Sequence, residues 1–392
     1  MNMLASELFD TNLGVPACGN WNDVIFTSSN HGVIPLLSTG IANISSVPDE
    51  VLHIVRSSAI KSAYWGEQLL NIQNELLTAL HSNDMPCAIY KGASVATCYP
   101  HPELRQHGDI DILVRQNDFL SAADLLEGAG CVRHGTKHSF HTSFSKNGVS
   151  VELHRAVSCF PDNSAGQYCI DLFSHALDQI SSSTINEWAF PVLLPKYQLL
   201  SLLFHMERHM TSSSIGLRQL CDWAVCVYRY RDVIDDDMLS DFARCGVLPF
   251  ARVLTQTCTH FLGMSQLEWS RSVDKIVVSR MINEVLDGGI ARSVSPDRSF
   301  SCMFVRTPHL GIEKTWVGSL ITKLSIKART RYSIVNRFPF LLPAFWIYIP
   351  LKSVVRSRKN GNGKWHILSI MSIARKRRKL YRDLHLFVSK QP

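Results

Sequence analysis

The sequence predicts an α+β protein, in which a region of short strands precedes a mainly helical region. Leucines and other apolar residues recur at three- and four-residue spacing from Pro48 to His81, and again from Leu194 onward, which is typical of amphipathic helices. Between residues 87 and 155 the apolar segments are short and several alternate with polar residues, which indicates strands. The 392 residues, 46% of them hydrophobic, suffice for two or three domains of about 100–200 residues each.

Shifts in composition divide the chain into four segments. Residues 1–47 are rich in Asn, Ser and Gly and lack periodicity, so we expect an irregular segment that lies over the surface. Residues 48–193 contain the long helical pattern and the expected strands, and residues 194–312 form the expected helical domain. Residues 313–392 form a strongly basic C-terminal segment.

The basic segment carries 17 Lys and Arg residues and no acidic residue from Lys314 to Arg382, in a chain of net charge +7. Such a stretch (residues 314–382) suits an anionic surface, either lipid or RNA. Its run Phe338–Leu351 is apolar, but it is short and interrupted by prolines, whereas a membrane span needs about 20 apolar residues. We therefore expect no transmembrane helix. The alternative is that this run packs onto the helical domain and the charges form a solvated face.

The cysteines and the N-terminus favour a cytoplasmic location. The N-terminus has no basic stretch followed by an apolar run, so no secretory signal is expected. The eleven cysteines are scattered and never form a CxxC motif, which disfavours a disulfide framework or a zinc site. The basic segment allows a peripheral position at the inner face of the membrane.

Asn147-Gly148 lies between two alternating segments and predicts a two-residue β-hairpin turn. Pairing outward from this turn predicts three facing pairs along the hairpin: Phe144 with Val151, Ser143 with Glu152, and His141 with His154. Because side chains two positions apart share a face of a strand, one face of the hairpin is apolar and points toward a core. The other face is polar, carries Glu152 and both histidines, and can line a site.

Asp109-Ile110-Asp111 alternates carboxylates with an isoleucine at the start of a second expected strand. Two carboxylates two positions apart on a strand lie about 6–7 Å apart at the backbone, so they can share a divalent ion or each bind one of a pair. Glu152, on the polar face of the hairpin, is the expected third carboxylate. Mg²⁺ accepts such oxygen ligands. An Asp-x-Asp pair also arises by chance, so a second feature is needed to favour a metal site.

That second feature is the turn Lys91-Gly92-Ala93-Ser94, which follows a short apolar strand. A glycine there lets the backbone approach a phosphate, whose oxygens the turn amides can bind. A phosphate-binding turn and two metal ions are the parts that phosphoryl transfer requires.

Several motifs recur in the order of a known family. The segment KGASVATCYPHPELRQHGDIDILV, followed by VELHRAV and then LLFHMERHM and LRQLCDWAV, resembles the uncharacterised bacterial nucleotidyltransferase-like family of the polymerase-β-type nucleotidyltransferase superfamily. The resemblance covers about residues 50–235. It implies a small mixed β-sheet, the nucleotidyltransferase core with flanking helices, followed by a mainly helical domain.

The resemblance also implies roles for individual residues. Asp109 and Asp111 are then metal ligands and Glu152 is the third carboxylate, while Gly92 and Ser94 lie at the phosphates. The turn reads Gly-Ala-Ser here, where the superfamily has Gly-Gly-Ser.

We therefore predict an enzyme that moves a nucleotidyl group from an NTP, with ATP as the expected donor, to an unidentified acceptor and releases pyrophosphate. Two Mg²⁺ ions are expected at the carboxylates, with Mn²⁺ as the alternative. The alternative function is a non-catalytic protein that binds a nucleotide or a partner on the same scaffold. No GxxxxGK[ST] loop and no GxSxG motif is present, which disfavours a P-loop kinase and a serine hydrolase.

Three further residues are candidates for substrate contacts. Lys91 and Arg105 can bind the triphosphate, although a solvent-facing lysine and an ordinary loop cation are the simpler interpretations. His154 shares the face of Glu152 and can touch the substrate or orient that carboxylate, or it is a hydrogen-bonded histidine without a catalytic role.

Two side-chain pairs at helical spacing are expected to be structural. His205 and His209 lie four apart with Glu207 between them, which is not the HExxH order of a zinc site, so we expect them to pack against the next helix. Arg218 and Asp222 on that next helix are expected to form an ion pair with each other, while the resemblance allows the alternative that this helical layer reaches the site.

Overall fold

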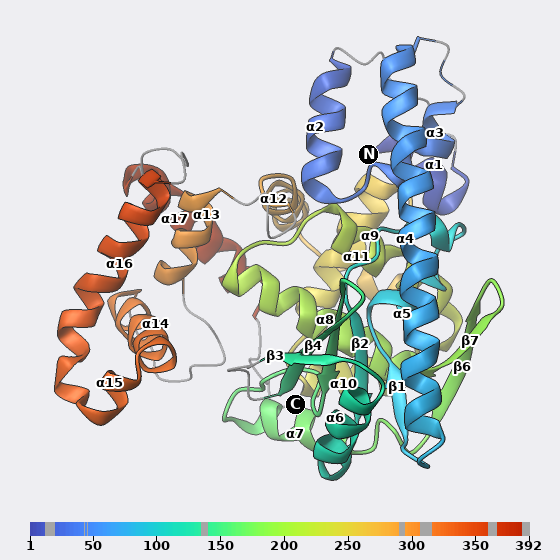
Figure 1. The fold of residues 1–392 in the computed structure, drawn as a ribbon. Coiled ribbons are helices and arrows are strands. Elements are labelled where there is room, and N and C mark those ends of the chain that lie inside the picture. Colours follow the sequence, from blue (N-terminus) through green and yellow to red (C-terminus); the bar gives the residue numbers. More distant parts are fainter. Residues whose placement is uncertain are drawn as a thin grey trace.

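One mixed β-sheet, with helices on both faces, forms the centre of the protein. The structure is a computed structural model, and it describes residues 1–11, 20–42, 44, 46–134, 140–289, 295–305, 316–359 and 367–385. Within these ranges seven strands form the sheet in the order β3-β4-β5-β2-β1-β7-β6 (Figure 1). β2 is parallel to β5 and β1 is parallel to β7, and the other neighbours are antiparallel. The α+β class predicted from the sequence is confirmed.

The strands are short, as their sequence patterns predict. Their bounds are β1 Cys87–Ile89, β2 Ile110–Val114, β3 Val132–His134, β4 His141–Lys146, β5 Val149–His154, β6 Ile180–Ile185 and β7 Trp188–Leu193. The hairpin of β4 and β5 has the predicted register, with Phe144 opposite Val151 and His141 opposite His154. Asn147 and Gly148 both have positive φ, 51° and 80°, as a tight turn of this kind requires.

The first face of the sheet is covered by two helices. Alternate side chains such as Ile110 and Ile112 point to this face and pack with α4 (Asp49–His81) and α6 (Phe119–Gly128). The long leucine pattern of the sequence accounts for α4, whose leucines from position 69 onward are buried in this core. The remaining short elements near this part of the chain are α5 Gly92–Ala96, η2 Pro102–Leu104 and η3 Gln116–Asp118.

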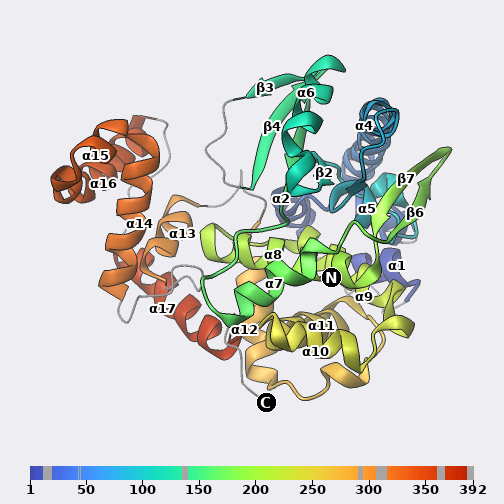
Figure 2. The ribbon, with the colours of Figure 1, turned by 90° about the horizontal axis from the view of Figure 1, so that it is seen from below.

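The second face of the sheet is covered by the helical domain. Tyr90 and Leu113 point to this face and belong to a core shared with α8 (Pro195–Ser212) and α9 (Leu217–Arg229), which lie against the sheet (Figure 2). Pro195 occupies the start of α8, where its missing N–H costs no hydrogen bond. The other helices of this part are α7 Ser164–Ser174, η4 Arg231–Val233, α10 Asp236–Arg244, α11 Leu248–Leu262, η5 Glu268–Ser270 and α12 Lys275–Leu286.

The N-terminal segment is helical, so the expectation of an irregular segment over residues 1–47 is wrong for the part that the structure describes. Its elements are α1 Asn2–Phe9, α2 Trp21–His31, η1 Pro35–Leu37 and α3 Ser38–Ala42. Leu4 and Leu8 of α1 are at most 3% exposed and pack in the core of the helical domain. Helices of this length contain only two or three turns, so their periodicity does not stand out in the sequence. Residues 12–19 lie outside the described part.

The basic C-terminal segment forms a separate group of helices and a returning helix. Two short elements precede it, α13 Pro296–Ser301 and η6 Cys302–Phe304, and its own elements are α14 Trp316–Arg331, α15 Ser333–Arg337, η8 Pro339–Leu341, α16 Leu342–Lys359 and α17 Ile367–Asp383. Helices α14, α15 and α16 stand apart from the sheet (Figure 1) and have a small core of their own, which includes Leu324 and Ile349. Among the described helices, none combines the length and the apolar character that crossing a membrane requires.

The returning helix α17 is fixed to the helical domain through Arg377, which is 1% exposed. Its guanidinium donates hydrogen bonds to the carbonyl oxygens of Met210 at 2.7 Å and Ser213 at 2.8 Å, and to Oε1 of Glu284 at 2.9 Å. Met210 and Ser213 lie at the end of α8, where carbonyl groups lack partners within the helix. One arginine of the basic run is therefore part of the core and not of a surface.

Candidate active site between the sheet and the helical domain

Asp111 and Glu152 lie side by side on the parallel strands β2 and β5, in direct register. Nε2 of His154 lies 2.9 Å from Oδ1 of Asp111 and 3.2 Å from Oε2 of Glu152. Both carboxylates therefore reach the same point in space, which in this structure is an imidazole nitrogen. The site faces the helical domain, because Asp111 shares the face of Leu113.

Lys91 lies inside the site and is paired with Asp111. Its Nζ is 2.7 Å from Oδ1 of Asp111, and the side chain is 8% exposed. The solvent-facing interpretation of Lys91 is thus wrong. Burial opposes the charge of Asp111, but Lys91 and His154 outweigh this effect and hold the pKa of Asp111 well below its ordinary value. Asp111 is an anion at neutral pH.

The glycine turn lies directly against the Asp-x-Asp segment. Lys91 and Gly92 both have positive φ, 59° and 44°, and a Cβ at position 92 would approach the carbonyl oxygen of Asp109 to 3.2 Å. The space and the backbone conformation both favour glycine here. The hydroxyl of Ser94 is buried and donates to the carbonyl oxygen of Lys91 at 2.9 Å, so this group stabilises the turn.

Asp109 lies at the mouth of the site. It immediately precedes β2, which begins at Ile110, and its side chain is exposed. Although one side of the carboxylate is open to solvent, partial burial and then the negative charges of Asp111 and Glu152 raise the pKa of Asp109. A cation placed among these three carboxylates would relieve their repulsion.

Glu152 connects the carboxylates to a second histidine. Nε2 of His141, on β4, lies 3.6 Å from Oε1 of Glu152. Burial raises the pKa of Glu152, but the contacts with His154 and the charge of His141 outweigh this and leave it lowered. Ligand atoms of His141, Glu152 and His154 all lie within 4.8 Å of one another, close enough to hold a metal ion.

Helix α8 forms the opposite wall of the site with a basic side of its own. The rings of His205 and His209 are 4.4 Å apart, and the guanidinium of Arg208 lies 5.3 Å from the ring of Phe140. Burial, followed by the positive charges of Arg208 and Lys91, lowers the pKa of His209 to about 4. The two histidines are packed together, and His209 is neutral at physiological pH.

The expected pair of Arg218 with Asp222 does not form, because Asp222 is bound to Arg105. The guanidinium of Arg105 donates to both carboxylate oxygens of Asp222, at 2.8 and 2.9 Å, and is 6% exposed. A loop residue before Asp109 is thereby fixed to α9. The guanidinium of Arg105, which was expected to bind phosphate, is therefore already engaged by Asp222.

Arg218 is left half-buried beside the site. Its Nε is enclosed and has no hydrogen-bond partner in the part of the chain that the structure describes. Burial and the charge of Arg105 lower the pKa of Arg218, while the charges of Asp222 and Asp109 act in the opposite direction. A buried guanidinium nitrogen that has no hydrogen-bonded anion in the described structure is a candidate to bind one.

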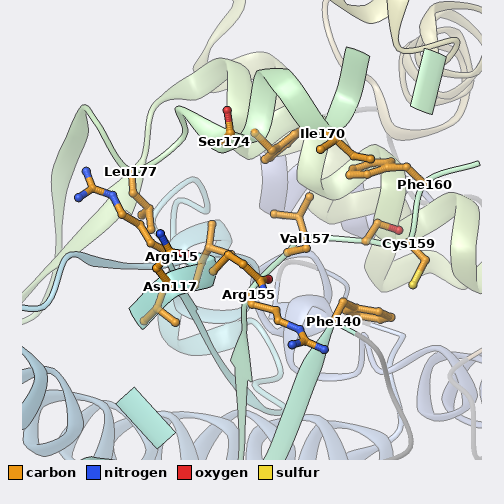
Figure 3. Close-up of a pocket in the computed structure, with 16 residues that line it drawn as sticks. Arg115, Asn117, Phe140, Arg155, Val157, Cys159, Phe160, Ile170, Ser174 and Leu177 are labelled. Atoms are coloured by element: carbon orange, nitrogen blue, oxygen red, sulfur yellow. The ribbon is translucent and has the colours of Figure 1, made fainter. Parts of the chain in front are cut away.

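A pocket of about 530 Å³ lies near the histidine side of the cluster, and its lining includes Leu113 and Phe140. Phe140 and Arg155 form one wall and Phe160 and Ile170 lie across from them (Figure 3). Phe140 also stacks on His154, with ring centroids 6.1 Å apart. Phe140 thus connects the pocket to His154 of the carboxylate cluster, and the pocket is lined mainly by apolar side chains.

The structure brings five residues predicted from the sequence together and adds a wall that the sequence did not predict. Asp109, Asp111, Glu152, Lys91 and His154 come together as a cluster. The basic wall was missed as a site element, although one signal was present. Position 208 carries an arginine three residues after His205 and one before His209, so three basic or imidazole groups share one side of a helix that is rich in leucine.

A mixed sheet with carboxylates on adjacent strands, a glycine turn against them and a helical domain over them define a protein of the nucleotidyltransferase class. A family model described as "uncharacterised nucleotidyltransferase" matches residues 17–263, and the chain belongs to this family. No curated protein matches the chain. Membership of this family supports nucleotidyl transfer as the class of reaction.

Proposed function

We propose that the protein transfers a nucleotidyl group from an NTP, with ATP as the expected donor, to an acceptor and releases pyrophosphate. The observation that carries this proposal is the convergence of Asp111 and Glu152, in register on parallel strands, on one nitrogen at 2.9 and 3.2 Å. Asp109 stands at the mouth of this cluster beside the glycine turn. Nucleotidyl transfer needs little covalent chemistry from a protein, but it needs such concentrated negative charge to hold cations at a triphosphate.

The donor atoms fit a hard divalent cation. Asp109, Asp111 and Glu152 supply carboxylate oxygens, which Mg²⁺ prefers, and two ions are the expected number. His141 and His154 add imidazole nitrogens within ligand distance of Glu152, which Mn²⁺ also accepts, so Mn²⁺ is the alternative cation. When bound, such ions would neutralise charge on the triphosphate and on the leaving pyrophosphate.

The chain's own residues would bind and orient the donor. Lys91 and the turn at Gly92 lie beside the carboxylates, so they can meet the phosphates. Arg218 and Arg208 extend the positive charge along the helical wall. His154 holds Asp111 and Glu152 toward one point. Glu152 is ionised at neutral pH, because its pKa is lowered, and can therefore act as a ligand or accept a proton.

The pocket beside Phe140 is the proposed place for the acceptor. It shares Phe140 with the carboxylate cluster, and its apolar lining suits an acceptor with an apolar or aromatic part. Ile170 is 52% exposed, so Ile170→Trp can fill the pocket without disturbing a core. We expect this change to reduce transfer while leaving stabilisation of the protein by ATP unchanged.

The experiment that tests the proposal is incubation of the protein with cell-extract fractions and ATP labelled with ³²P at the α-phosphate. We expect a fraction to take up the label when Mg²⁺ or Mn²⁺ is present. ATP labelled at the γ-phosphate is the internal control, because nucleotidyl transfer leaves that label on pyrophosphate. Uptake from γ-labelled ATP alone would instead show phosphoryl transfer and contradict the proposal.

A matched pair of variants assigns the activity to the site. Asp109→Asn should abolish both the uptake and the metal-dependent rise of the melting temperature with ATP. Asp124→Asn makes the same chemical change on the exposed side of α6 and should alter neither. Stabilisation by ATP that needs no cation and persists in Asp109→Asn would favour the non-catalytic binding protein.

A further inference from the structure

The outer side of α16 is apolar although it faces solvent. Going along the chain from η8 into α16, the exposed residues follow helical spacing of three and four: Phe340, Pro343, Ala344, Ile347, Tyr348 and Leu351. The largest of them are far from buried, with Phe340 75% exposed, Ile347 67% and Leu351 59%. A surface helix normally presents polar residues on this side, so the stripe requires an explanation.

The inner side of the same helix already has its partner. Ile349 is 5% exposed and packs with Leu324 of α14, and Phe345 and Trp346 pack against the same small core. Nε1 of Trp346 donates to the hydroxyl of Ser325 at 2.8 Å. The helices α14 to α16 therefore pack together through the inner side of α16, and the outer stripe takes no part in this packing. The run Phe338–Leu351 packs on α14 and leaves its other side uncovered, away from the sheet (Figure 1).

Exposed cations border the stripe. Arg337 stands over the ring of Phe338 at 5.5 Å, and Lys352 lies 5.4 Å from the ring of Tyr348. Arg329 and Arg331, at the end of α14, are exposed as well. No acidic residue occurs from Lys314 to Arg382, so nothing within the sequence of this group offsets the positive charge.

We propose that the group α14–α16 docks on an anionic lipid bilayer, with the α16 stripe in the head-group region and the flanking cations against lipid phosphates. Apolar and aromatic side chains enter this region, and nearby Lys and Arg bind anionic lipid. A nucleic acid would meet the cations but would leave the stripe in water, which is why lipid fits better than RNA. With no described helix able to span, the group lies on the membrane surface.

The test is co-sedimentation of the full-length protein with vesicles of phosphatidylcholine alone and with one quarter phosphatidylglycerol. We expect binding to the anionic vesicles at physiological salt, and binding at least tenfold weaker to the neutral ones. The triple variant Phe340→Ser, Ile347→Ser, Leu351→Ser should lower binding to anionic vesicles at least tenfold. Its circular dichroism and melting temperature should stay unchanged, because these side chains lie outside the core.

Matched variants separate the stripe from exposed apolar residues in general. Ile60 and Leu120 are 71% and 69% exposed on other helices, and Ile60→Ser, Leu120→Ser should leave vesicle binding unchanged. Arg337→Gln, Lys352→Gln should weaken binding and reduce its dependence on salt.

Three results would overturn the proposal. The first is failure of the wild-type protein to bind anionic vesicles. The second is a gel shift with tRNA that the charge variants lower and the serine variants leave unchanged, in the absence of vesicle binding. The third is a dimer in solution that the serine variants dissociate, because a second copy of the chain would then cover the stripe.

Discussion

Arg105 and Asp222 form a two-bond ion pair, at 2.8 and 2.9 Å, across 117 positions of the sequence. Both side chains are 7% exposed, and the hydroxyl of Tyr99 donates a third hydrogen bond to the same carboxylate at 2.8 Å. The pair joins the loop that leads into Asp109 to helix α9. It therefore fixes the position of the sheet relative to the helical domain at the mouth of the site.

Breaking this pair should destabilise the protein. Arg105→Gln leaves the charge of Asp222 buried, and such changes cost about 3–5 kcal/mol of unfolding free energy. Urea denaturation measures this loss. Arg115→Gln is the control, because Arg115 and Asp178 form a pair with both side chains nearly half exposed, and solvent-exposed pairs contribute little to stability, so this variant should cost far less than Arg105→Gln. Equal costs for the two variants would refute the role of the buried pair.

The carboxylates at the mouth and in the interior should respond differently to neutralisation. Asp109→Asn should lower transfer at least about 100-fold while the melting temperature holds or rises, because the exposed charge of Asp109 is repelled by its neighbours. Asp111→Asn should also abolish transfer, but with a lower melting temperature, because Lys91 then loses its buried partner. Full activity in both variants with Mg²⁺ present would rule out the carboxylate assignment.

Arg218 should contribute to nucleotide binding and contribute little to the stability of the fold. Its Nε makes no hydrogen bond in the described structure, so Arg218→Gln breaks none there. We expect the melting temperature without ligand to stay within about 2 °C of wild type, since an effect below about 0.5 kcal/mol shifts it little in a chain of this size. The apparent affinity for ATP, measured as thermal protection, should fall at least about tenfold. A drop in stability with unchanged affinity would make Arg218 a structural residue.

Acid should destabilise the protein through its buried histidines. Burial, and then the charge of Arg105, lowers the pKa of His107 from 6.5 to about 3. Below pH 6.5 the unfolded chain takes up a proton that the folded protein does not, so stability that is present at higher pH is lost as the pH falls toward about 3. From pH 7 to pH 5 this single group should cost about 2 kcal/mol.

The check is urea denaturation at both pH values for wild type and His107→Asn. The variant should lose about 2 kcal/mol less between pH 7 and pH 5 than the wild type does. His53→Asn makes the same change on an exposed part of α4 and should keep the wild-type difference. An identical pH dependence in all three proteins would show that His107 is not the responsible group.

Local patterns in the sequence are sufficient to predict much of the sheet and its carboxylates. The register of β4 and β5 follows from Asn147-Gly148, because a two-residue turn fixes which residues face each other. Glu152 is therefore predictable as a site residue from one hairpin. The pairing of Glu152 with its neighbour on β2, Asp111, is not fixed by any turn, since the two strands are parallel and separated in the chain by α6, β3 and β4.

Side-chain pairs between segments that are distant in the sequence are not predictable from local patterns. Spacing on one helix suggested Arg218 with Asp222, but tertiary packing brings Arg105 closer, and one carboxylate can hold only one guanidinium in the two-bond geometry. Lys91 similarly reads as the end of a strand, and only the fold shows that it turns inward to Asp111. The helices of the first 42 residues were missed because each is too short to show a period.

The bond from Arg377 to the end of α8 has a consequence for biosynthesis. The ribosome makes α8 about 165 residues before Arg377. The carbonyl groups of Met210 and Ser213 therefore lack this hydrogen-bond donor until α17 has been synthesised. Helix α8 carries His205, Arg208 and His209, and its last turn is expected to fray until then. A nascent chain would accordingly complete its sheet early but acquire a rigid basic wall only near the end of translation. Premature release before α17 should yield a protease-sensitive product that does not consume nucleotide.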